Sequence, residues 1–417
     1  MPMKVAAALA VLLVGVRARS EERRCPPMAD LATLVRCAQV SSDSVVRARS
    51  GLAAAQARRD DAGRFLPTNP TLEVGVGRRK AESGETGLDR SVELAQTLEI
   101  GGQRSARIAA ADAELRAASV AAEVASRDLA TDVLAAAVEV VRARSVLALV
   151  GEQLGAAERL TKVSGARSQK GVAAPLETEL TQAAAIQAMR EHRGAAQALA
   201  AAEADLAAAV GEDVRLADAA DLPRTELTSR ELPELERAAQ ERPQIVAARA
   251  DAAVAHARIE LLRRERIPDV TIAAGYRHEE FSDAIGARIS VPLPVVRRHG
   301  PEIAMQEALA AQAESAARQV SLRALLAVRA AWASWQRARG AVATISPDLE
   351  SRLRQDVTAL QDAYQRGTMP LTQILAALRE AQGARRTLLE TRADVVRAAL
   401  ELNRAAGLPS CPTGGCP

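Results

Sequence analysis

Three stretches decide the fold: TNPTLEVGVG at 68–77, RSVELAQTLEI at 90–100, and the proline-free run 103–168. Apolar and polar residues alternate in the first two, which predicts two strands that form a hairpin across 68–100. The third stretch is rich in Ala, Leu, Val, Arg and Glu, so it predicts one long helix. At 1.5 Å per residue this helix would be ~100 Å long. It must therefore lie against other long helices rather than inside a compact domain.

The same block occurs a second time, as a hairpin predicted at 270–293 and a long helix predicted at 301–366. The ends of the two long helices match, because Gln-Lys-Gly at 169–171 precedes Pro175-Leu176 and Gln-Arg-Gly at 365–367 precedes Pro370-Leu371. The two glycines lie 196 positions apart. Solenoid units repeat every 20–50 residues or so, and this spacing therefore predicts a duplicated half-protein.

A return helix follows each glycine turn, predicted at 175–210 and at 370–406, and each stops before a glycine. We expect a first repeat over 19–211, a linker over 212–232 that carries Pro223, a second repeat over 233–407 and an irregular tail over 408–417. The apolar residues of the first long helix recur at spacings of four and three, which predicts coiled-coil packing.

One residue interrupts the second long helix. Pro347 would kink or break it, and Ser346 before the proline is a suitable N-cap. The matching position of the first copy holds Gly151. We therefore expect a bend at the same level of both copies.

Composition narrows the class of protein. The chain has 417 residues, with 55 basic and 52 acidic side chains that nearly cancel, and only two each of Trp, Tyr and Phe. Nucleic-acid binding would need a clustered basic face with stacking aromatics. Lys4 and the apolar run 5–16 have the form of a signal peptide at 1–18, which predicts export. No run reaches the ~18 apolar residues of a transmembrane helix.

Residues with the capacity for chemistry are sparse. Cys25 and Cys37, and likewise Cys411 and Cys416, are close enough in sequence for disulfides in an oxidising compartment, whereas neither pair has zinc-site spacing. The four histidines, at 192, 256, 278 and 299, lack the spacing of a helical metal pair. No catalytic motif is present. We predict no enzyme activity, no cofactor and no metal site.

Strand, strand, long helix, glycine turn and return helix, twice over, resembles the TolC-like outer-membrane efflux family. The heavy-metal efflux branch is the most similar. The motifs that carry the resemblance are Asn69-Pro70-Thr71-Leu72, Leu98-Glu99-Ile100-Gly101-Gly102-Gln103-Arg104, Glu241-Arg242-Pro243, Ile267-Pro268-Asp269-Val270 and the stretch from Tyr364 to Leu371. The resemblance implies a mainly α fold with a small β part. Long helices would form a coiled-coil barrel, and two β-hairpins per subunit would complete a trimeric twelve-stranded β-barrel.

The resemblance also implies a function. The chain would be the outer-membrane channel of a tripartite efflux or secretion system, extending into the periplasm. Its partners would be two further copies, a periplasmic adaptor (membrane fusion) protein, an inner-membrane pump and outer-membrane lipid. The tip turns that dock the adaptor would contain Lys170, Gly171, Pro175, Leu176, Arg366, Gly367, Pro370 and Leu371.

Acidic residues just past the family's turns line a pore gate. The matching positions here are Glu177 in the first copy and Gln373 and Ala376 in the second, so only the first copy keeps an acid. Glu177 and Gln373 are the gate candidates, and a ring of Glu177 side chains would attract cations. Glu177 equally suits the dipole at the start of an ordinary helix. A periplasmic coiled-coil protein that forms no channel is the alternative function, and the amphipathic strands argue against it.

Overall fold

The computed structural model describes residues 25–80, 86–218, 230–279, 282–295, 299–346 and 348–409. The predicted signal peptide, Pro223, Pro347 and the Cys411–Cys416 pair lie outside these ranges. Two compact units share the chain. The turn unit comprises Met1–Val46, Ser126–Ala239 and Leu326–Pro417, and the sheet unit comprises Arg47–Ala125 and Gln240–Leu325. Each unit thus combines parts of both sequence repeats.

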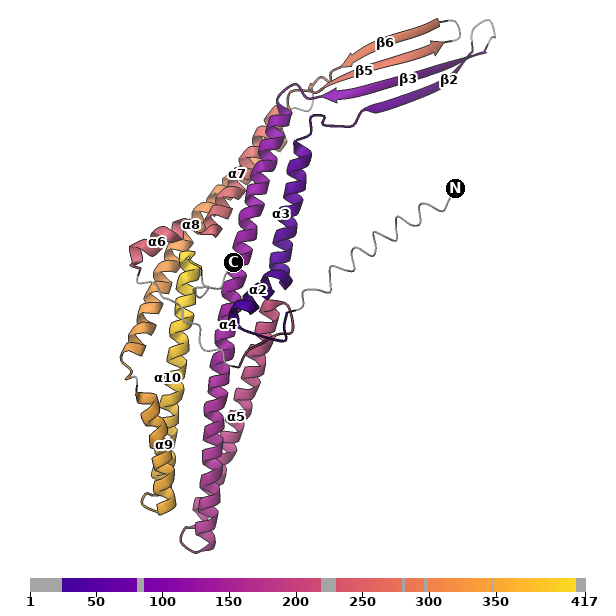
Figure 1. Cartoon of the computed structure of the whole chain (residues 1–417). Coiled ribbons are helices and arrows are strands. Elements are labelled where there is room, and N and C mark those ends of the chain that lie inside the picture. The colour runs from indigo at the N-terminus through magenta and orange to yellow at the C-terminus, as the bar shows by residue number, and fades with distance from the viewer. Residues whose placement is uncertain are drawn as a thin grey trace. The chain divides into compact units, whose positions relative to one another are not determined.

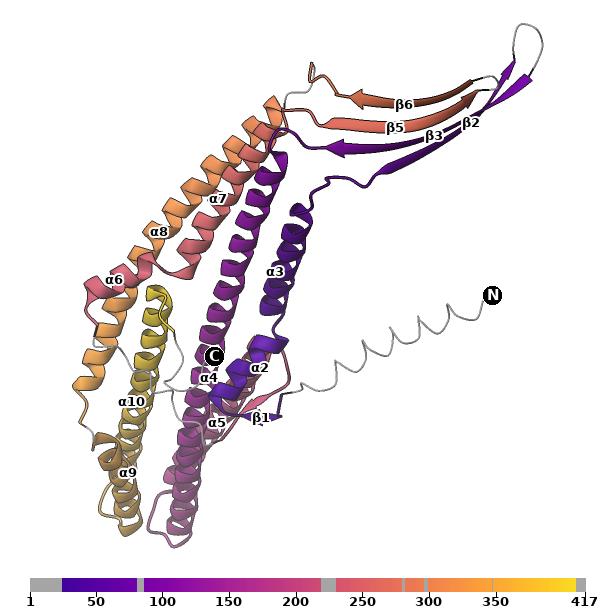
Figure 2. The same ribbon diagram turned by 45° about the horizontal axis from the view of Figure 1, so that its top comes forward.

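Four antiparallel strands form the sheet of the sheet unit: β2 (Thr71–Lys80), β3 (Thr86–Leu98), β5 (Val270–Glu279) and β6 (Ser282–Ser290). Their order is β2-β3-β5-β6, as Figure 2 shows. The two hairpins are therefore joined through β3 and β5, which come from different repeats and pair from Leu98 opposite Val270 to Arg90 opposite His278.

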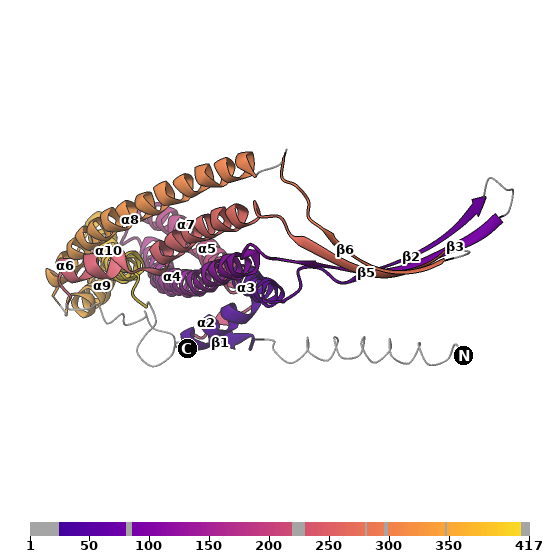
Figure 3. The same ribbon diagram turned by 90° about the horizontal axis from the view of Figure 1, so that it is seen from above.

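Helices α3 (Asp43–Ala62) and α7 (Pro243–Arg264) and the first parts of α4 (Gln103–Gln169) and α8 (Gly300–Ala343) complete this unit. Helices α7 and α8 run side by side (Figure 3) and pack through Ala255, Ile259, Ile303 and Ala310. The carboxylate of Glu114 on α4 forms ion pairs with Arg258 of α7 at 2.7 Å and with Arg58 of α3 at 3.4 Å. Apolar packing and ion pairs therefore hold these helices together.

The turn unit holds β1 (Met28–Ala29), α2 (Leu31–Ser41), α5 (Pro175–Val210), β4 (Arg215–Leu216), α6 (Leu232–Gln240), α9 (Leu349–Arg366) and α10 (Leu371–Ala406). Strand β1 pairs with β4, which lies in the segment predicted as a linker. A disulfide joins Cys25 to Cys37. Leu235, Val328, Trp335 and Leu402 are among the buried residues that pack α6, α8 and α10 together.

The prediction of one helix over 301–366 is wrong. Helix α8 ends at Ala343 and α9 begins at Leu349, with Asp348 rather than Ser346 as the N-cap residue. The first copy behaves differently, because α4 continues through Gly151 as one helix. A helical glycine costs only about 1 kcal/mol relative to alanine, whereas an internal proline costs ~3 kcal/mol or more. The helix is therefore interrupted in the second copy only, and a bend at Gly151 stays a prediction, because a helix can bend without ending.

No helix among the described residues has both the length and the apolar character that a bilayer crossing requires.

Candidate docking and gate site

The two glycine turns have the same backbone conformation. Gly171 has φ +72° and Gly367 has φ +71°, which is the left-handed region that favours glycine. In the first turn the amide of Gly171 donates to Ser168 O, and that of Val172 donates to Arg167 O. In the second turn Gly367 donates to Tyr364 O and Thr368 donates to Ala363 O. Both are Schellman turns, which satisfy the free carbonyls of a helix end. Figure 1 shows the two hairpins that they close, α4 with α5 and α9 with α10.

The first turn presents its side chains to solvent. Lys170, Gly171 and Pro175 are exposed. Two apolar side chains lie beside them, Val172 with 66% and Leu176 with 60% of its surface exposed. This turn therefore combines one positive charge with an apolar surface.

The second turn buries its leucine. Arg366, Gly367 and Pro370 are exposed, but Leu371 keeps only 4% of its surface exposed. It belongs to a core cluster with Leu160 of α4, Tyr364 of α9, and Ile374 and Leu378 of α10. We therefore correct the prediction that Leu371 is a docking residue, because a side chain packed in this core has no surface to offer a partner.

Arg167 lies near the end of α4 in the first copy and contacts the second turn. Its Nη1 donates to Tyr364 O at 2.8 Å, and its guanidinium carbon lies 5.2 Å from the centre of the Tyr364 ring. A Cβ added to Gly367 would come within 3.4 Å of both Nη atoms. A hydrogen bond and a cation–π contact thus hold the two copies together at this level.

Glu177 and Tyr364 meet across the two copies. The Tyr364 hydroxyl donates to Glu177 Oε2 over 3.4 Å, a long hydrogen bond. Burial of the phenol, and next the nearby Glu177 carboxylate, raise the pKa of Tyr364. Glu177 also occupies the first turn of α5, where the helix dipole favours an acid. Gln373 is exposed. The two gate candidates therefore have different environments.

Sequence reasoning missed the contacts between the copies. Arg167, which contacts Tyr364 of the second copy, was not singled out. Also missed was a buried hydrogen bond of 2.7 Å within the first copy, between Ser164 of α4 and Thr181 of α5. One signal was available, because the chain has only two tyrosines and one of them stands three residues before Gly367. Within the described ranges no group of three or more His, Cys, Asp or Glu residues is suited to hold a metal ion.

The sheet has one apolar and one polar face. Residues paired across antiparallel strands lie on the same face. One row pairs Val74 with Val92, Val92 with Tyr276, and Tyr276 with Ile285. The next row along the strands pairs Glu73 with Glu93 and Glu93 with Gly275. The large apolar side chains Leu72, Val74, Val76, Val92, Leu94, Ile285 and Ile289 are exposed on the first face.

The second face carries charge. Arg288 of β6 forms an ion pair with Glu93 of β3, and Thr97 and Thr271 share a hydrogen bond of 3.0 Å. A sheet with these two faces is suited to separate an apolar environment from an aqueous one.

Known proteins with the same pattern are found by sequence and by structure. Residues 34–212 and 235–408 match the family described as outer membrane efflux protein. Protein CyaE of Bordetella pertussis is 29% identical over 74% of this chain and 72% of its own length. The nickel-cobalt-cadmium resistance protein NccC of Alcaligenes xylosoxydans xylosoxydans is 28% identical over 63% of this chain and 60% of its own length.

Among solved structures, CusC is similar with a TM-score of 0.75 and 19% identity, over 93% of this chain and 96% of CusC. This similarity confirms the predicted fold class, long helices combined with a small β part.

Proposed function

Because the chain belongs to the outer membrane efflux protein family, we propose that three copies assemble into one trans-periplasmic exit duct. The two-faced sheet is the observation that carries this proposal. In a single chain β2 and β6 are edge strands, and unpaired backbone groups are costly in lipid. Closure of three four-stranded sheets into one twelve-stranded barrel would pair these edges. Its apolar face would meet lipid and its charged face would line the pore.

Docking of a periplasmic adaptor is assigned to the two turns. The first turn supports this assignment best, since Val172 and Leu176 are exposed beside Lys170. Exposed apolar residues next to a charge are the usual material of a protein interface, where burial supplies affinity and charge supplies orientation. An inner-membrane pump would deliver the substrate through the adaptor.

The gate is assigned to the pair formed by Glu177 and Tyr364. Three copies would bring three carboxylates into one ring, which attracts cations and repels anions. The Tyr364 hydroxyl, which comes from the other sequence repeat, would hold Glu177 in position because it donates a hydrogen bond to the carboxylate. Gln373 offers a neutral amide and would add no charge to the ring.

Transition-metal cations are the substrates that we infer. The support is the likeness to a nickel-cobalt-cadmium resistance protein. Specificity would lie mainly with the pump, and the duct would contribute a preference for cations at the ring of Glu177.

The decisive experiment is negative-stain imaging of the detergent-extracted protein. A trimeric tube would support the duct. A soluble or fibrous particle would contradict it and favour the alternative of a periplasmic coiled-coil protein. For the gate, Glu177→Gln should lower cation selectivity in planar bilayers, because the ring loses its charge. Gln373→Ala is the matched control, and unchanged selectivity of the Glu177 variant would refute the assignment.

A further inference from the structure

Large apolar side chains are exposed at all four connections between the helices and the sheet. They are Phe65 and Leu66 between α3 and β2, Ile100 between β3 and α4, Ile267 between α7 and β5, and Leu293 and Val295 after β6. We call these six residues the junction collar. Phe65 is 76% and Leu293 77% exposed. All of them lie in the sheet unit.

Buried polar contacts tie the connections together. Gln103 is buried, and its Nε2 donates to Ile267 O at 2.7 Å while its Oε1 accepts from the amide of Gly101. A Cβ on Gly101 would lie 2.6 Å from the side chain of Ile267, so these two connections are in contact. Arg104 reaches Gly63 O at 2.7 Å and brings the first connection to the start of α4. The collar is therefore one structural level of the sheet unit.

The collar continues the apolar face of the sheet. Ile289 lies near the end of β6, and Val291 and Leu293 follow the strand; all three are exposed. In the outer-membrane proteins of this family the sheet meets lipid, and aromatic side chains usually mark the two membrane interfaces. This chain has only six aromatic residues, and Trp335 is buried among helices of the turn unit. The interface below the sheet therefore needs another anchor.

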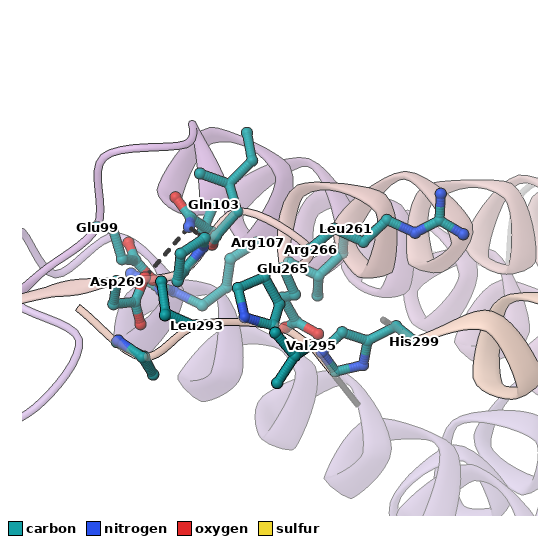
Figure 4. Close-up of a pocket in the computed structure, with 14 residues that line it drawn as sticks. Glu99, Gln103, Arg107, Leu261, Glu265, Arg266, Asp269, Leu293, Val295 and His299 are labelled. Atoms are coloured by element: carbon teal, nitrogen blue, oxygen red, sulfur yellow. Dashed lines mark hydrogen bonds and ion pairs between the residues drawn. The ribbon is translucent and has the colours of Figure 1, made fainter. Parts of the chain in front are cut away.

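A cavity of about 610 Å³ opens at the collar (Figure 4). Ile267, Leu293 and Val295 of the collar line it. The remaining wall includes three acids and three bases, which are Glu99, Glu265, Asp269, Arg107, Arg266 and His299. Its volume is in the range of sites for small ligands, and its wall combines apolar and charged side chains.

Glu99 lacks one partner. Its side chain is only 9% exposed, and Arg107 pairs with one carboxylate oxygen. The other oxygen, Oε2, is buried and accepts no hydrogen bond from any described residue. Asp269 lies at the same end of the cavity, with Oδ1 accepting from Gln103 at 3.1 Å. Burial and, next, the charge of Glu99 raise the pKa of Asp269. This end of the cavity therefore favours a cationic donor of hydrogen bonds.

We propose that the junction collar and its cavity form a binding site for a phospholipid of the membrane whose headgroup carries a primary ammonium, namely phosphatidylethanolamine. The ammonium donates to Glu99 and Asp269, since it brings both the charge and the N–H groups that these carboxylates require. The phosphate lies toward His299 at the other end of the cavity, where Arg266 and Glu265 also line the wall. The collar residues meet the glycerol and upper acyl chains.

The test compares ethanolamine with choline lipids, because a quaternary ammonium has no N–H to donate. The full-length protein is reconstituted with equimolar phosphatidylethanolamine and phosphatidylcholine in a phosphatidylglycerol background, and retained lipid is measured by mass spectrometry after detergent washing. We expect roughly tenfold enrichment of the ethanolamine lipid, as charge-assisted hydrogen bonds are the strong ones. Equal retention of the two lipids would overturn the proposal.

Two variants assign the enrichment to the cavity. Glu99→Gln removes the buried charge, and Asp269→Asn leaves the pair of Glu99 and Arg107 in place should the first variant fold poorly. Each should abolish the enrichment. Asp251→Asn, at an exposed position of α7 that does not line the cavity, is the matched control. Enrichment that survives Asp269→Asn would contradict the site.

A second experiment measures how deeply the junction collar lies in the membrane. In Leu293→Trp the new indole should be quenched more by lipids brominated near the headgroup than by lipids brominated deep in the chain. The unmodified protein with its two tryptophans is the blank. Absence of quenching, or stronger quenching by the deep bromines, would remove the collar from the interface. The inference rests on the proposed contact of the sheet with lipid, but these readouts do not involve efflux, so their failure is distinguishable from a failure of the docking turns or the gate.

Discussion

The two glycine turns have nearly the same sequence and the same backbone, yet they present opposite surfaces. After the first turn Leu176 is 60% exposed, and after the second Leu371 is 4% exposed. Both leucines follow a proline and lie at the start of a return helix of 36 residues, Leu176 as its second residue and Leu371 as its first. Local sequence therefore cannot account for the difference.

The neighbours of each turn account for it. The second turn packs against α4, where Arg167 contacts Tyr364 and Gly367 and where Leu160 joins Leu371 in one cluster. The described residues place no side chain or backbone atom near a Cβ built on Gly171. Duplication copied the turn but gave the copies different surroundings, so one became a packed element and the other a free surface.

The matched leucines test this comparison with the largest expected effect. Leu371→Ala should destabilise the protein by about 2–5 kcal/mol, because it leaves a cavity in a packed cluster. Leu176→Ala should change stability by no more than about 0.5 kcal/mol, as for most exposed positions. Thermal unfolding in detergent measures both. Equal losses would mean that the first turn is packed in the assembled protein.

The glycines provide the next test. Alanine at either position adopts a left-handed conformation at a cost of roughly 1–2 kcal/mol. Gly367→Ala should cost more than Gly171→Ala, since only its Cβ meets the Arg167 guanidinium at 3.4 Å. In the double variants with Arg167→Ala the two costs should become equal, and a difference that persists would show that Arg167 is not its cause.

The affinity for the periplasmic adaptor tests whether the exposed first turn is a docking surface. Leu176→Ser should weaken binding of the periplasmic adaptor by about fivefold or more, the effect of removing one interface residue worth ~1 kcal/mol. Surface plasmon resonance with the purified adaptor measures the affinity. Ile186→Ser is the control, because Ile186 is exposed on α5 more than two turns further along. An equal loss at both sites would make the interface the helix face rather than the turn.

The smallest effect is expected at the hydroxyl of Tyr364. Tyr364→Phe should cost at most about 1 kcal/mol at neutral pH, the net value of one hydrogen bond, because the bond to Glu177 is long. The raised pKa of Tyr364 determines how the stability of the protein changes at alkaline pH. The phenol of Tyr364 ionises less readily in the folded protein than in the unfolded chain. Its contribution to the free energy of unfolding is therefore complete below the usual tyrosine pKa and is lost as the pH rises through the raised pKa.

Tyr364→Phe should accordingly be less sensitive to alkaline unfolding than the unmodified protein. A pH series of thermal midpoints measures this, with the unmodified protein as the reference. Identical alkaline profiles for the Tyr364 variant and the unmodified protein would contradict a buried, coupled phenol.

The long helices repeat the lesson on a larger scale. Gly151 and the segment before Pro347 occupy matching positions, and equal bends were predicted. Helix α4 continues through Gly151 without a break, and a Cβ there would lie 3.8 Å from the His192 ring of α5, which is ordinary van der Waals contact. A helical glycine costs only about 1 kcal/mol relative to alanine, so the helix continues through it. The two positions differ because a helix tolerates an internal glycine and does not tolerate an internal proline.

The sequence by itself determined the repeat, the hairpins, the positions of both glycine turns and the family. These features follow from patterns that are local, namely alternation of period two, a heptad seam and glycine at a helix end. The bounds of α5, Pro175–Val210, could be predicted in this way.

Only the tertiary structure decided which turn is buried, that Tyr364 meets Glu177, that β3 pairs with β5, and that Glu99 and Asp269 share one cavity. Each of these contacts joins residues more than 150 positions apart. Their formation depends on how the two copies pack, and no local pattern along the chain specifies that packing.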